Sequence, residues 1–196
     1  MERKKMKLQK TVFLGDSITE GYGVKRDECW VSQQNGYICN RGISGDTTAG
    51  MCRRFQAHVL REAPERAVIM GGLNDLLLGY SVQSVCENLK KMYDAVLDAG
   101  IMLIPAICVR PDFDELLGEG WISSRKQLAL LPENIAYQED WIREYVKIHD
   151  LNCIDFARYF PEYTPDGYQR YFIDGVHLNA RGHAIMAKIA AQVLEK

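Results

Sequence analysis

Short apolar runs alternate along the chain with longer stretches in which apolar residues recur every three or four positions. The short runs have the length of buried strands, and the longer stretches have the period of amphipathic helices. The runs that we interpret as strands are Lys10–Leu14, Tyr37–Arg41, Ala67–Met70, Ile101–Val109 and Asn152–Phe156. Strands that alternate with helices in this way predict an α/β fold, with a parallel sheet covered by helices on both faces.

Capping residues indicate where the main helices begin. Side chains of Ser, Thr and Asn accept hydrogen bonds from the unpaired amides of a first helical turn, and proline fits the first helical position. The expected starting residues are Thr47 or Thr48, Ser81, Pro132 and Asn179, with Gly100 ending the second helix. The chain has no internal repeat, low-complexity tract or linker, so we expect residues 1–196 to form one domain.

The bulk composition excludes several classes of protein. The 196 residues are 47% hydrophobic and 26% charged, which is ordinary for a globular protein. A net charge of -2 gives no reason to expect nucleic acid as a partner, and no apolar stretch is long enough for membrane insertion. The basic start, Met1–Lys10, precedes an apolar run too short for a signal peptide. We therefore expect a cytoplasmic protein and leave homo-oligomerisation open.

The six cysteines do not form a metal-binding or redox motif. No pair has the C-x-x-C spacing or another zinc-type spacing, and several lie in apolar runs where a thiol behaves as a small hydrophobic group. The residues are Cys29, Cys39, Cys52, Cys86, Cys108 and Cys153. We expect all six to be reduced and structural, and we expect the protein to use no metal and no cofactor.

Four polar, glycine-containing clusters fall where the carboxyl ends of the strands are expected. Gly15–Ser17 follows the first strand, Ser44–Thr47 the second, and Gly71–Asp75 the third. Asp174–His177 lies in the loop before the last helix. The carboxyl ends of parallel strands share one edge of a sheet, and ligands of open α/β sheets bind there. We therefore expect the four clusters to meet at one site.

A serine, an imidazole and a carboxylate at one site suit acyl transfer. Ser17 is the candidate nucleophile, His177 the candidate general base, and Asp174 the residue that orients the base. The backbone amides of Ser17 and Gly45 and the side-chain amide of Asn74 are candidate donors to the oxyanion. Each cluster alone has a plain structural explanation, such as a capping serine or a turn aspartate. Their combination favours catalysis.

The other three histidines are expected to be structural. His58 falls on the apolar side of its helix, so we expect it to be packed in the core. His149 lies at a helix end, where a cation suits the helix dipole, and His183 lies in the first turn of the last helix.

Two segments do not fit the regular pattern and are candidates for pocket walls. Residues 110–131 mix charge, glycine, tryptophan and leucine after the fourth strand. Residues 156–172 are aromatic, and we expect the tyrosines from Tyr159 to Tyr171 to border Ser17. Such walls suit a compact substrate, because an aromatic ring offers an apolar face and the tyrosine hydroxyl a polar tip.

At its four clusters the sequence resembles the SGNH (GDSL-type) serine hydrolases. Gly15–Ile18 resembles the family's Gly-Asp-Ser-Leu block, with isoleucine in place of leucine, and Ser44–Thr47 resembles its second block. Gly72–Asp75 matches the Gly-x-Asn-Asp block and Asp174–His177 the Asp-x-x-His block. The resemblance implies a three-layer α/β/α, flavodoxin-like fold with a parallel five-stranded sheet of order 2-1-3-4-5. It also implies ester hydrolysis without a cofactor, and it is greatest to lysophospholipase/thioesterase-like and small arylesterase members.

The leading hypothesis is a serine esterase that hydrolyses small carboxylic esters with a short acyl chain, including aryl esters and acetylated sugars. A lysophospholipase or acyl thioesterase acting on longer chains is the alternative within the family. A flavodoxin-like phosphate- or nucleotide-binding module without hydrolysis is the alternative from another class, because Gly15–Gly23 is a glycine-containing loop after a strand. That loop lacks the phosphate-binding spacings, and the module would give Asn74, Asp174 and His177 no role. A catalytically silent binding protein is a third hypothesis, against which the intact site residues stand.

Overall fold

Five parallel strands form one sheet in the order β2-β1-β3-β4-β5 in the computed structural model, which describes residues 9–117, 120–122, 124–164 and 166–195. Each neighbouring pair is parallel. The strands are β1 (Lys10–Gly15), β2 (Tyr37–Gly42), β3 (Arg66–Ile69), β4 (Met102–Ile107) and β5 (Ile154–Asp155). The expected sheet and its order are confirmed.

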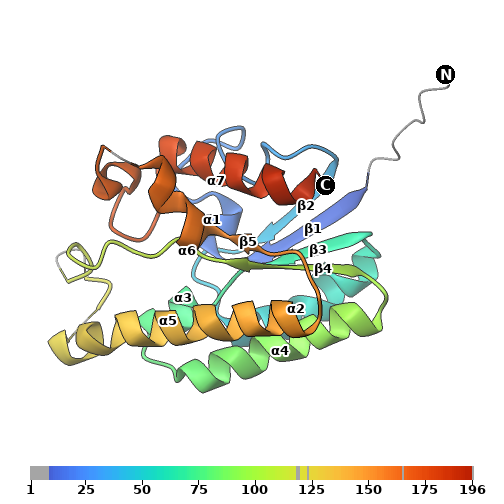
Figure 1. Ribbon diagram of the computed structural model, residues 1–196, viewed down its shortest axis with the longest axis horizontal. Coiled ribbons are helices and arrows are strands. Elements are labelled where there is room, and N and C mark those ends of the chain that lie inside the picture. The colour runs from blue at the N-terminus through green and yellow to red at the C-terminus, as the bar shows by residue number, and fades with distance from the viewer. Residues whose placement is uncertain (1–8, 118–119, 123, 165, 196) are drawn as a thin grey trace.

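Helices cover both faces of the sheet, as Figure 1 shows. One layer holds α2 (Thr48–His58), α3 (Leu73–Leu77), α4 (Val82–Asp98) and α5 (Arg125–Ile148). The other holds α1 (Ser17–Glu20), α6 (Phe156–Tyr159) and α7 (Ala180–Leu194). Short 3₁₀ helices are η1 (Leu60–Glu62), η2 (Phe160–Tyr163) and η3 (Tyr168–Tyr171). The expected three-layer α/β/α architecture is therefore confirmed.

Three of the expected helix starts are capped as the sequence indicates. Thr47 accepts a hydrogen bond from the amide of Gly50 at the start of α2. Ser81 caps α4, and Asn179 caps α7 by accepting from two amides of its first turn. Each bond satisfies an amide that has no acceptor within its own helix.

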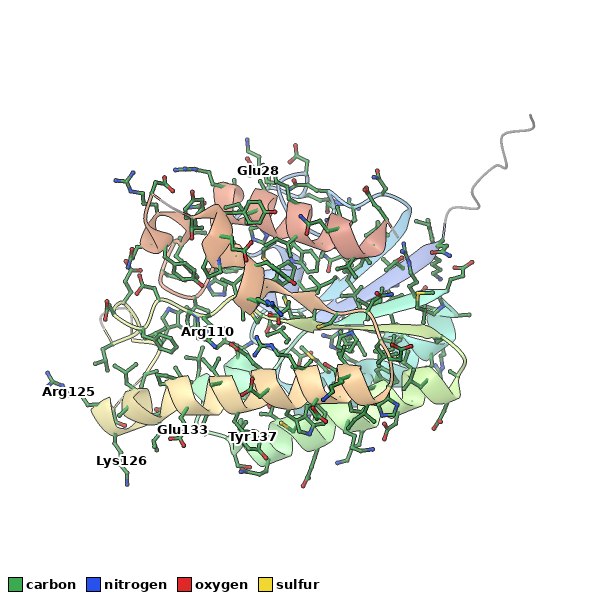
Figure 2. The ribbon with its side chains drawn as sticks, viewed as in Figure 1. Glu28, Arg110, Arg125, Lys126, Glu133 and Tyr137 are labelled. Carbon is green, nitrogen blue, oxygen red and sulfur yellow. The ribbon has the colours of Figure 1, made fainter. Side chains whose placement is uncertain are left out.

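The expected start of the third helix is wrong. Helix α5 begins at Arg125, where Ser124 accepts from the amide of Gln127 at 3.1 Å, and Pro132 lies inside the helix. A proline within a helix removes one backbone hydrogen bond and crowds the preceding turn. The cap that Ser124 provides at the start of α5 and the burial of Leu131 offset that cost. In Figure 2 the labelled side chains of Arg125, Lys126, Glu133 and Tyr137 extend from α5 away from the sheet.

The last two strands are shorter than their apolar runs. The amide of Ile101 closes the end of α4 by donating to the carbonyl of Val96, so β4 begins one residue later. Strand β5 has two residues, because Asp155 accepts from the amide of Arg158 and starts α6. An apolar run therefore marks the buried segment but not where the backbone changes conformation.

Trp30 connects the core to the first helix. Its ring lies edge-on to Phe13 of β1 and to Phe156 of α6, with centroids 5.4 and 5.2 Å apart. Its indole nitrogen donates to the carbonyl of Ile18 at 2.9 Å. A buried indole N–H needs such an acceptor, so this bond holds α1 at the end of β1.

Candidate active site

Ser17 lies at the turn between β1 and α1. Asp16 precedes it, and the Asp16 side chain accepts from the amide of Ile18 at 3.0 Å, which starts the helix. The Ser17 carbonyl accepts from the amides of Gly21 and Tyr22. Ser17 is the first residue of α1, and such a residue has no acceptor for its amide within the helix. The turn therefore presents a hydroxyl and an unused amide together at the carboxyl end of β1.

Ser17, His177 and Asp174 form a continuous series of hydrogen bonds. His177 Nε2 lies 2.9 Å from Ser17 Oγ, and His177 Nδ1 lies 2.8 Å from Asp174 Oδ2. A carboxylate only accepts hydrogen bonds, so Nδ1 carries the proton and Nε2 accepts from the serine hydroxyl. Residues that are 160 positions apart in the chain thus meet with the geometry of a nucleophile and its base.

Backbone contacts hold the loop that carries the histidine. Phe172 and Leu178 form an antiparallel bridge at its ends, and the amide of Ile173 donates to the carbonyl of His177 at 2.8 Å. From a different part of the chain, the amide of Asp112 donates to the carbonyl of Gly175 at 2.7 Å. The loop is therefore fixed both by its own closure and by the segment after β4.

Gly45 lies in a tight turn after β2. The amide of Asp46 donates to the carbonyl of Ile43, and Gly45 has a φ of +75°, which side-chain-bearing residues rarely adopt. The Ser44 amide and hydroxyl both donate to Glu20 at the end of α1. The turn that carries the Gly45 amide is thus attached to the helix that carries Ser17.

Asn74 lies beside the same turn. One N–H of its side-chain amide donates to the carbonyl of Asp46 at 2.9 Å, and the group has a second N–H to offer. The neighbouring Asp75 accepts from the amide and hydroxyl of Thr48, at 2.9 and 2.6 Å. The expected convergence of the second and third clusters is therefore observed.

A family model matches this chain where the four clusters lie. The match is to the GDSL-like Lipase/Acylhydrolase family and spans residues 13–185. The chain belongs to this family. GDSL acylhydrolases are carboxylic ester hydrolases, so the match assigns an enzyme and not a phosphate-binding module.

Individual GDSL relatives agree with this assignment. An arylesterase of Vibrio mimicus is 25% identical over 155 residues, which is 69% of this chain and 78% of the relative. Esterase TesA of Pseudomonas aeruginosa is 29% identical over 140 residues, covering 63% of this chain and 70% of TesA. A lipolytic G-D-S-L family protein of Veillonella parvula matches in structure with a TM-score of 0.79 and 25% identity, over 95% of this chain and 98% of the other.

Two aromatic rings contact the imidazole of this GDSL protein. The centroid of Tyr22 lies 4.4 Å from that of His177, and the centroid of Trp121 lies 5.2 Å from it in an edge-on arrangement. Trp121 also donates its indole N–H to the carbonyl of Asp174 at 3.0 Å. Tyr22 is missing from the residues that the sequence singled out, although it follows Ser17 by little more than one helical turn.

The tyrosines of residues 159–171 pack mainly on their own segment. Phe160 lies edge-on to Tyr168 and to Tyr171, and the Tyr171 hydroxyl donates to Asp166. Tyr168 donates to the carbonyl of Arg110. The two rings in contact with His177 come from other segments, and the expectation that these tyrosines border Ser17 stays a prediction. Four aromatic residues of this segment form a small cluster: Phe160, Tyr168, Tyr171 and Phe172.

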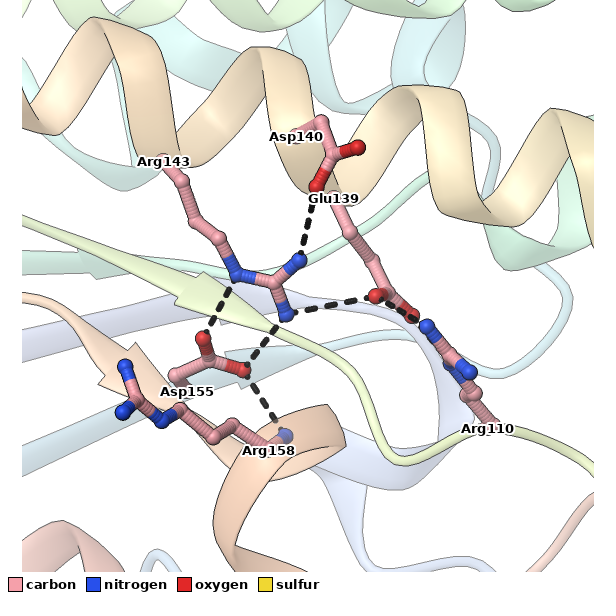
Figure 3. Close-up of polar contacts among 6 residues, drawn as sticks. All are labelled: Arg110, Glu139, Asp140, Arg143, Asp155 and Arg158. Atoms are coloured by element: carbon pink, nitrogen blue, oxygen red, sulfur yellow. Dashed lines mark hydrogen bonds and ion pairs between the residues drawn. The ribbon is translucent and has the colours of Figure 1, made fainter.

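Residues 110–131 contribute both to the site and to its support. Arg110 makes a bidentate pair with Glu139 of α5, with both bonds at 2.7 Å. Glu139 also accepts from Arg143, which reaches Asp155 at the start of α6; Figure 3 shows these contacts. Since Asp112 follows Arg110 by two residues, this network fixes the segment that binds the histidine loop.

The environment shifts the pKa values of two aspartates in opposite directions. Burial raises the pKa of Asp16 to about 7, although the amide of Ile18 partly offsets this. Burial also opposes the charge of Asp174, but hydrogen bonds from the His177 ring and backbone outweigh it and hold the pKa of Asp174 below its usual range. Asp174 therefore remains an anion beside the imidazole, as the orienting role requires.

The other histidines are structural in different ways. His183 is buried and accepts from the backbone amide of Trp30 at 3.3 Å. His149 ends α5 and stacks on Tyr145. The expected core position of His58 is wrong, because it is half-buried and contacts the guanidinium of Arg54.

The part of the chain that the structure describes holds no candidate metal site and no candidate membrane span. All six cysteines are free. Within the described residues, no three His, Cys, Asp or Glu side chains are grouped to hold a metal ion, and no helix in that part of the chain has the length and apolarity to cross a membrane.

Proposed function

We propose that this GDSL-family protein is a serine esterase that hydrolyses small carboxylic esters through an acyl-enzyme on Ser17. His177 is the general base and Asp174 orients it. The observation that supports the proposal most strongly is the unbroken hydrogen-bonded series from Ser17 Oγ through His177 to Asp174, with distances of 2.9 and 2.8 Å.

In the first step, Ser17 Oγ attacks the ester carbonyl while His177 Nε2 takes the hydroxyl proton. The carbonyl oxygen becomes an oxyanion that the amides of Ser17 and Gly45 and the side chain of Asn74 stabilise. When the intermediate collapses, the bond to the leaving alcohol breaks and His177 returns its proton to that oxygen. Ser17 is left acylated.

In the second step, water replaces the alcohol. His177 takes a proton from water as the water oxygen attacks the acyl carbonyl, and the same donors stabilise the second oxyanion. Collapse breaks the bond to Ser17 Oγ, which recovers the proton from His177 and releases the carboxylic acid. The histidine must be neutral to start each step, so acidification should slow turnover.

The proposed substrate is an ester with a short acyl chain and a compact or aromatic alcohol. The alcohol oxygen has to come within hydrogen-bond distance of His177 Nε2 to receive its proton. Tyr22 and Trp121 flank that ring, and Tyr22 is half-exposed, so an aromatic alcohol would find rings to stack on. The arylesterase of Vibrio mimicus, a 25% identical relative, gives independent support. The short acyl chain rests on the lack of a long uninterrupted apolar segment in the sequence.

The cellular location is a separate proposal. A cytoplasmic enzyme agrees with six cysteines that are all free in the structure, because disulfides are rare in that compartment. Fractionation of cells that express the protein tests it.

The test of the function compares Ser17→Ala with Ser32→Ala, a change of an exposed serine outside the relay. With p-nitrophenyl acetate as substrate, Ser17→Ala should lose about 10³-fold or more of kcat, and Ser32→Ala should keep it. A Ser17→Ala protein that keeps more than about a tenth of the rate would remove Ser17 from the mechanism. The kcat/KM series from acetate through butyrate and octanoate to palmitate tests the substrate separately. A maximum at octanoate or beyond would favour the thioesterase or lysophospholipase alternative.

A further inference from the structure

Arg54 lies on α2 with its guanidinium at the strand ends that carry the site. Its Nε donates to Asp46 Oδ2 at 2.6 Å. Its Nη2 donates to the carbonyl of Gly15 at 2.8 Å, and its Nη1 to the carbonyl of Arg41 at 2.7 Å. The side chain is 13% exposed. One planar group therefore joins the ends of β1 and β2 to the turn after β2.

Asp46 contacts or adjoins two of the three candidate oxyanion donors, Gly45 and Asn74. Its carbonyl accepts the side-chain amide of Asn74 at 2.9 Å, and its own peptide follows that of Gly45. Its carboxylate packs on α2 at Gly50, where a Cβ would overlap Asp46 Oδ1. The position of one aspartate thus determines where the Gly45 amide and the Asn74 amide lie.

The local charges explain why a guanidinium occupies this place. Asp16 and Asp75 lie nearby, and burial, with a smaller contribution from the charge of Asp46, raises the pKa of both. A cation that faces Asp46 offsets this concentration of acidic groups. An ammonium would supply the charge, but it lacks the fixed fork of donors that reaches two carbonyls and a carboxylate together.

We propose that Arg54 is a positioning residue of the oxyanion hole, which acts through Asp46 on the Gly45 and Asn74 donors at the same time. This inference rests on the proposed acyl transfer at Ser17. The Arg54 guanidinium contacts Asp46, two strand-end carbonyls and the His58 ring, not the side chains of Ser17 or His177. Its loss should therefore weaken stabilisation of the intermediate while the serine–histidine hydrogen bond persists.

The first test compares Arg54→Met with Arg53→Met, since Arg53 is the exposed neighbour on the same helix. Displacement of oxyanion donors by a fraction of an ångström should lower kcat of Arg54→Met on p-nitrophenyl acetate by about 10²-fold, with KM within about three-fold. Arg54→Lys should fall between Arg54→Met and wild type, because it keeps the charge without the fork. Arg53→Met should stay within about two-fold of wild type.

A double-mutant cycle with Asn74→Ala separates positioning from general loss of stability. If Arg54 acts through the Asn74 donor, its replacement should cost at least about ten-fold less in the Asn74→Ala background. The proposal would be overturned if the kcat losses of Arg54→Met and Asn74→Ala multiply fully in the double variant. It would also be overturned if Arg54→Met changes only KM, or if its kcat stays within two-fold of wild type. If Arg54→Met does not fold, Asp46→Asn decides, because it keeps the side-chain volume and removes the carboxylate. A folded Asp46→Asn protein with wild-type kcat would also overturn the proposal.

Labelling with a fluorophosphonate distinguishes this failure from failure of the proposed function. Labelling of wild type at Ser17, together with an inactive Ser17→Ala, supports the serine mechanism whatever the Arg54 variants do. If Ser17 labels normally and the Arg54 variants are fully active, only the positioning role is wrong. If Ser17→Ala stays active, the proposed function itself fails.

Discussion

The serine half and the histidine half of this site are supported by different kinds of structure. Ser17, Gly45 and Asn74 each follow a strand of the sheet, within a few residues of its carboxyl end. Asp174 and His177 lie in a loop between η3 and α7 that belongs to no strand. The sheet register therefore determines the serine half, whereas contacts between loops determine the histidine half.

The contacts of the two halves differ accordingly. Those of the serine half are local to the strand ends, such as the bond from Asn74 to Asp46. The histidine half depends on Trp121 and Asp112, which belong to the segment that Arg110 and Glu139 attach to α5. A loop held by other loops opens at lower free energy than a strand end. We therefore expect substitutions far from His177 to displace it more readily than equally distant substitutions displace Ser17.

The largest expected effect is in the histidine half. Asp174→Asn keeps the shape of the side chain but removes the charge that stabilises the imidazolium, and it favours the wrong histidine tautomer. We expect kcat to fall by about 10³- to 10⁴-fold with little change in thermal stability. Asp114→Asn, at an exposed aspartate of the segment after β4, is the control. A loss below about ten-fold would show that Asp174 does not orient the base.

The next effect is in the serine half. Asn74→Ala removes a donor that strengthens its contact only as the oxyanion forms, so kcat should fall by about 10²- to 10³-fold and KM should change less. Asn152→Ala, at an exposed asparagine, should leave both parameters unchanged. If KM rises while kcat is kept, Asn74 is a contact of the bound substrate instead.

The pH dependence of folding stability tests the contact between α7, which follows the histidine loop, and α1, which carries Ser17. Burial and the charge of His177 lower the pKa of His183 to about 4. This histidine accepts from Trp30, which in turn donates to Ile18 of α1. The unfolded chain takes up a proton near pH 6.5 and the folded chain only near pH 4, so acidification across this window should cost about 3 kcal/mol of stability.

The variant His183→Gln measures how much of the acid-induced loss of stability comes from His183, with urea melts at pH 7 and pH 4.5. The variant keeps an acceptor for Trp30 and cannot be protonated, so its stability should fall less on acidification than that of wild type. The comparison has to be between the two proteins, because Asp16 acts with the opposite sign. Its pKa is raised to about 7, so the folded state gains stability as the pH falls below that value. Equal losses in both proteins would contradict the role of His183.

The smallest expected effect is in the network that supports the histidine half. Glu139 is 3% exposed and pairs with Arg110 and Arg143, whereas Asp140, which contacts the same Arg143, is largely exposed. Glu139→Gln should cost about 2 kcal/mol, because two partly buried arginines lose their shared counter-ion. Asp140→Asn should cost less than about 0.5 kcal/mol, as exposed pairs do. Similar losses in thermal melts of the two variants would show that burial does not matter here.

The sequence predicts most of the serine half because its evidence is local. A buried strand followed by Gly-Asp-Ser, or by Gly-Leu-Asn-Asp, places the residue at a sheet edge before any tertiary contact is known. The lengths of β4 and β5 could not be read in the same way, because a hydrogen bond at Ile101 ends α4 and one at Asp155 starts α6, both inside the apolar runs. Pro132 misled the prediction of α5, because a buried face can outweigh one lost backbone bond.

The residues that sequence analysis missed depend on packing across the fold. Arg53 and Arg54 look alike in sequence, but α2 turns only Arg54 toward the strand ends. Tyr22 contacts His177 but belongs to no motif, whereas Trp121, which also contacts His177, lies in the segment 110–131 that the sequence marks as a pocket wall. Hydrophobic periodicity reports which face of an element is buried. It does not report what that face meets.

Trapping the acyl-enzyme tests the central claim most directly. The protein is mixed with p-nitrophenyl acetate, quenched in acid during turnover, digested and mapped by mass spectrometry, with His177→Gln treated in parallel. The account predicts one acetyl group on Ser17 of the wild type and its near absence from the variant, because the histidine has to take the serine proton. Turnover without any acetylated Ser17, or with the acetyl group on another residue, would contradict it.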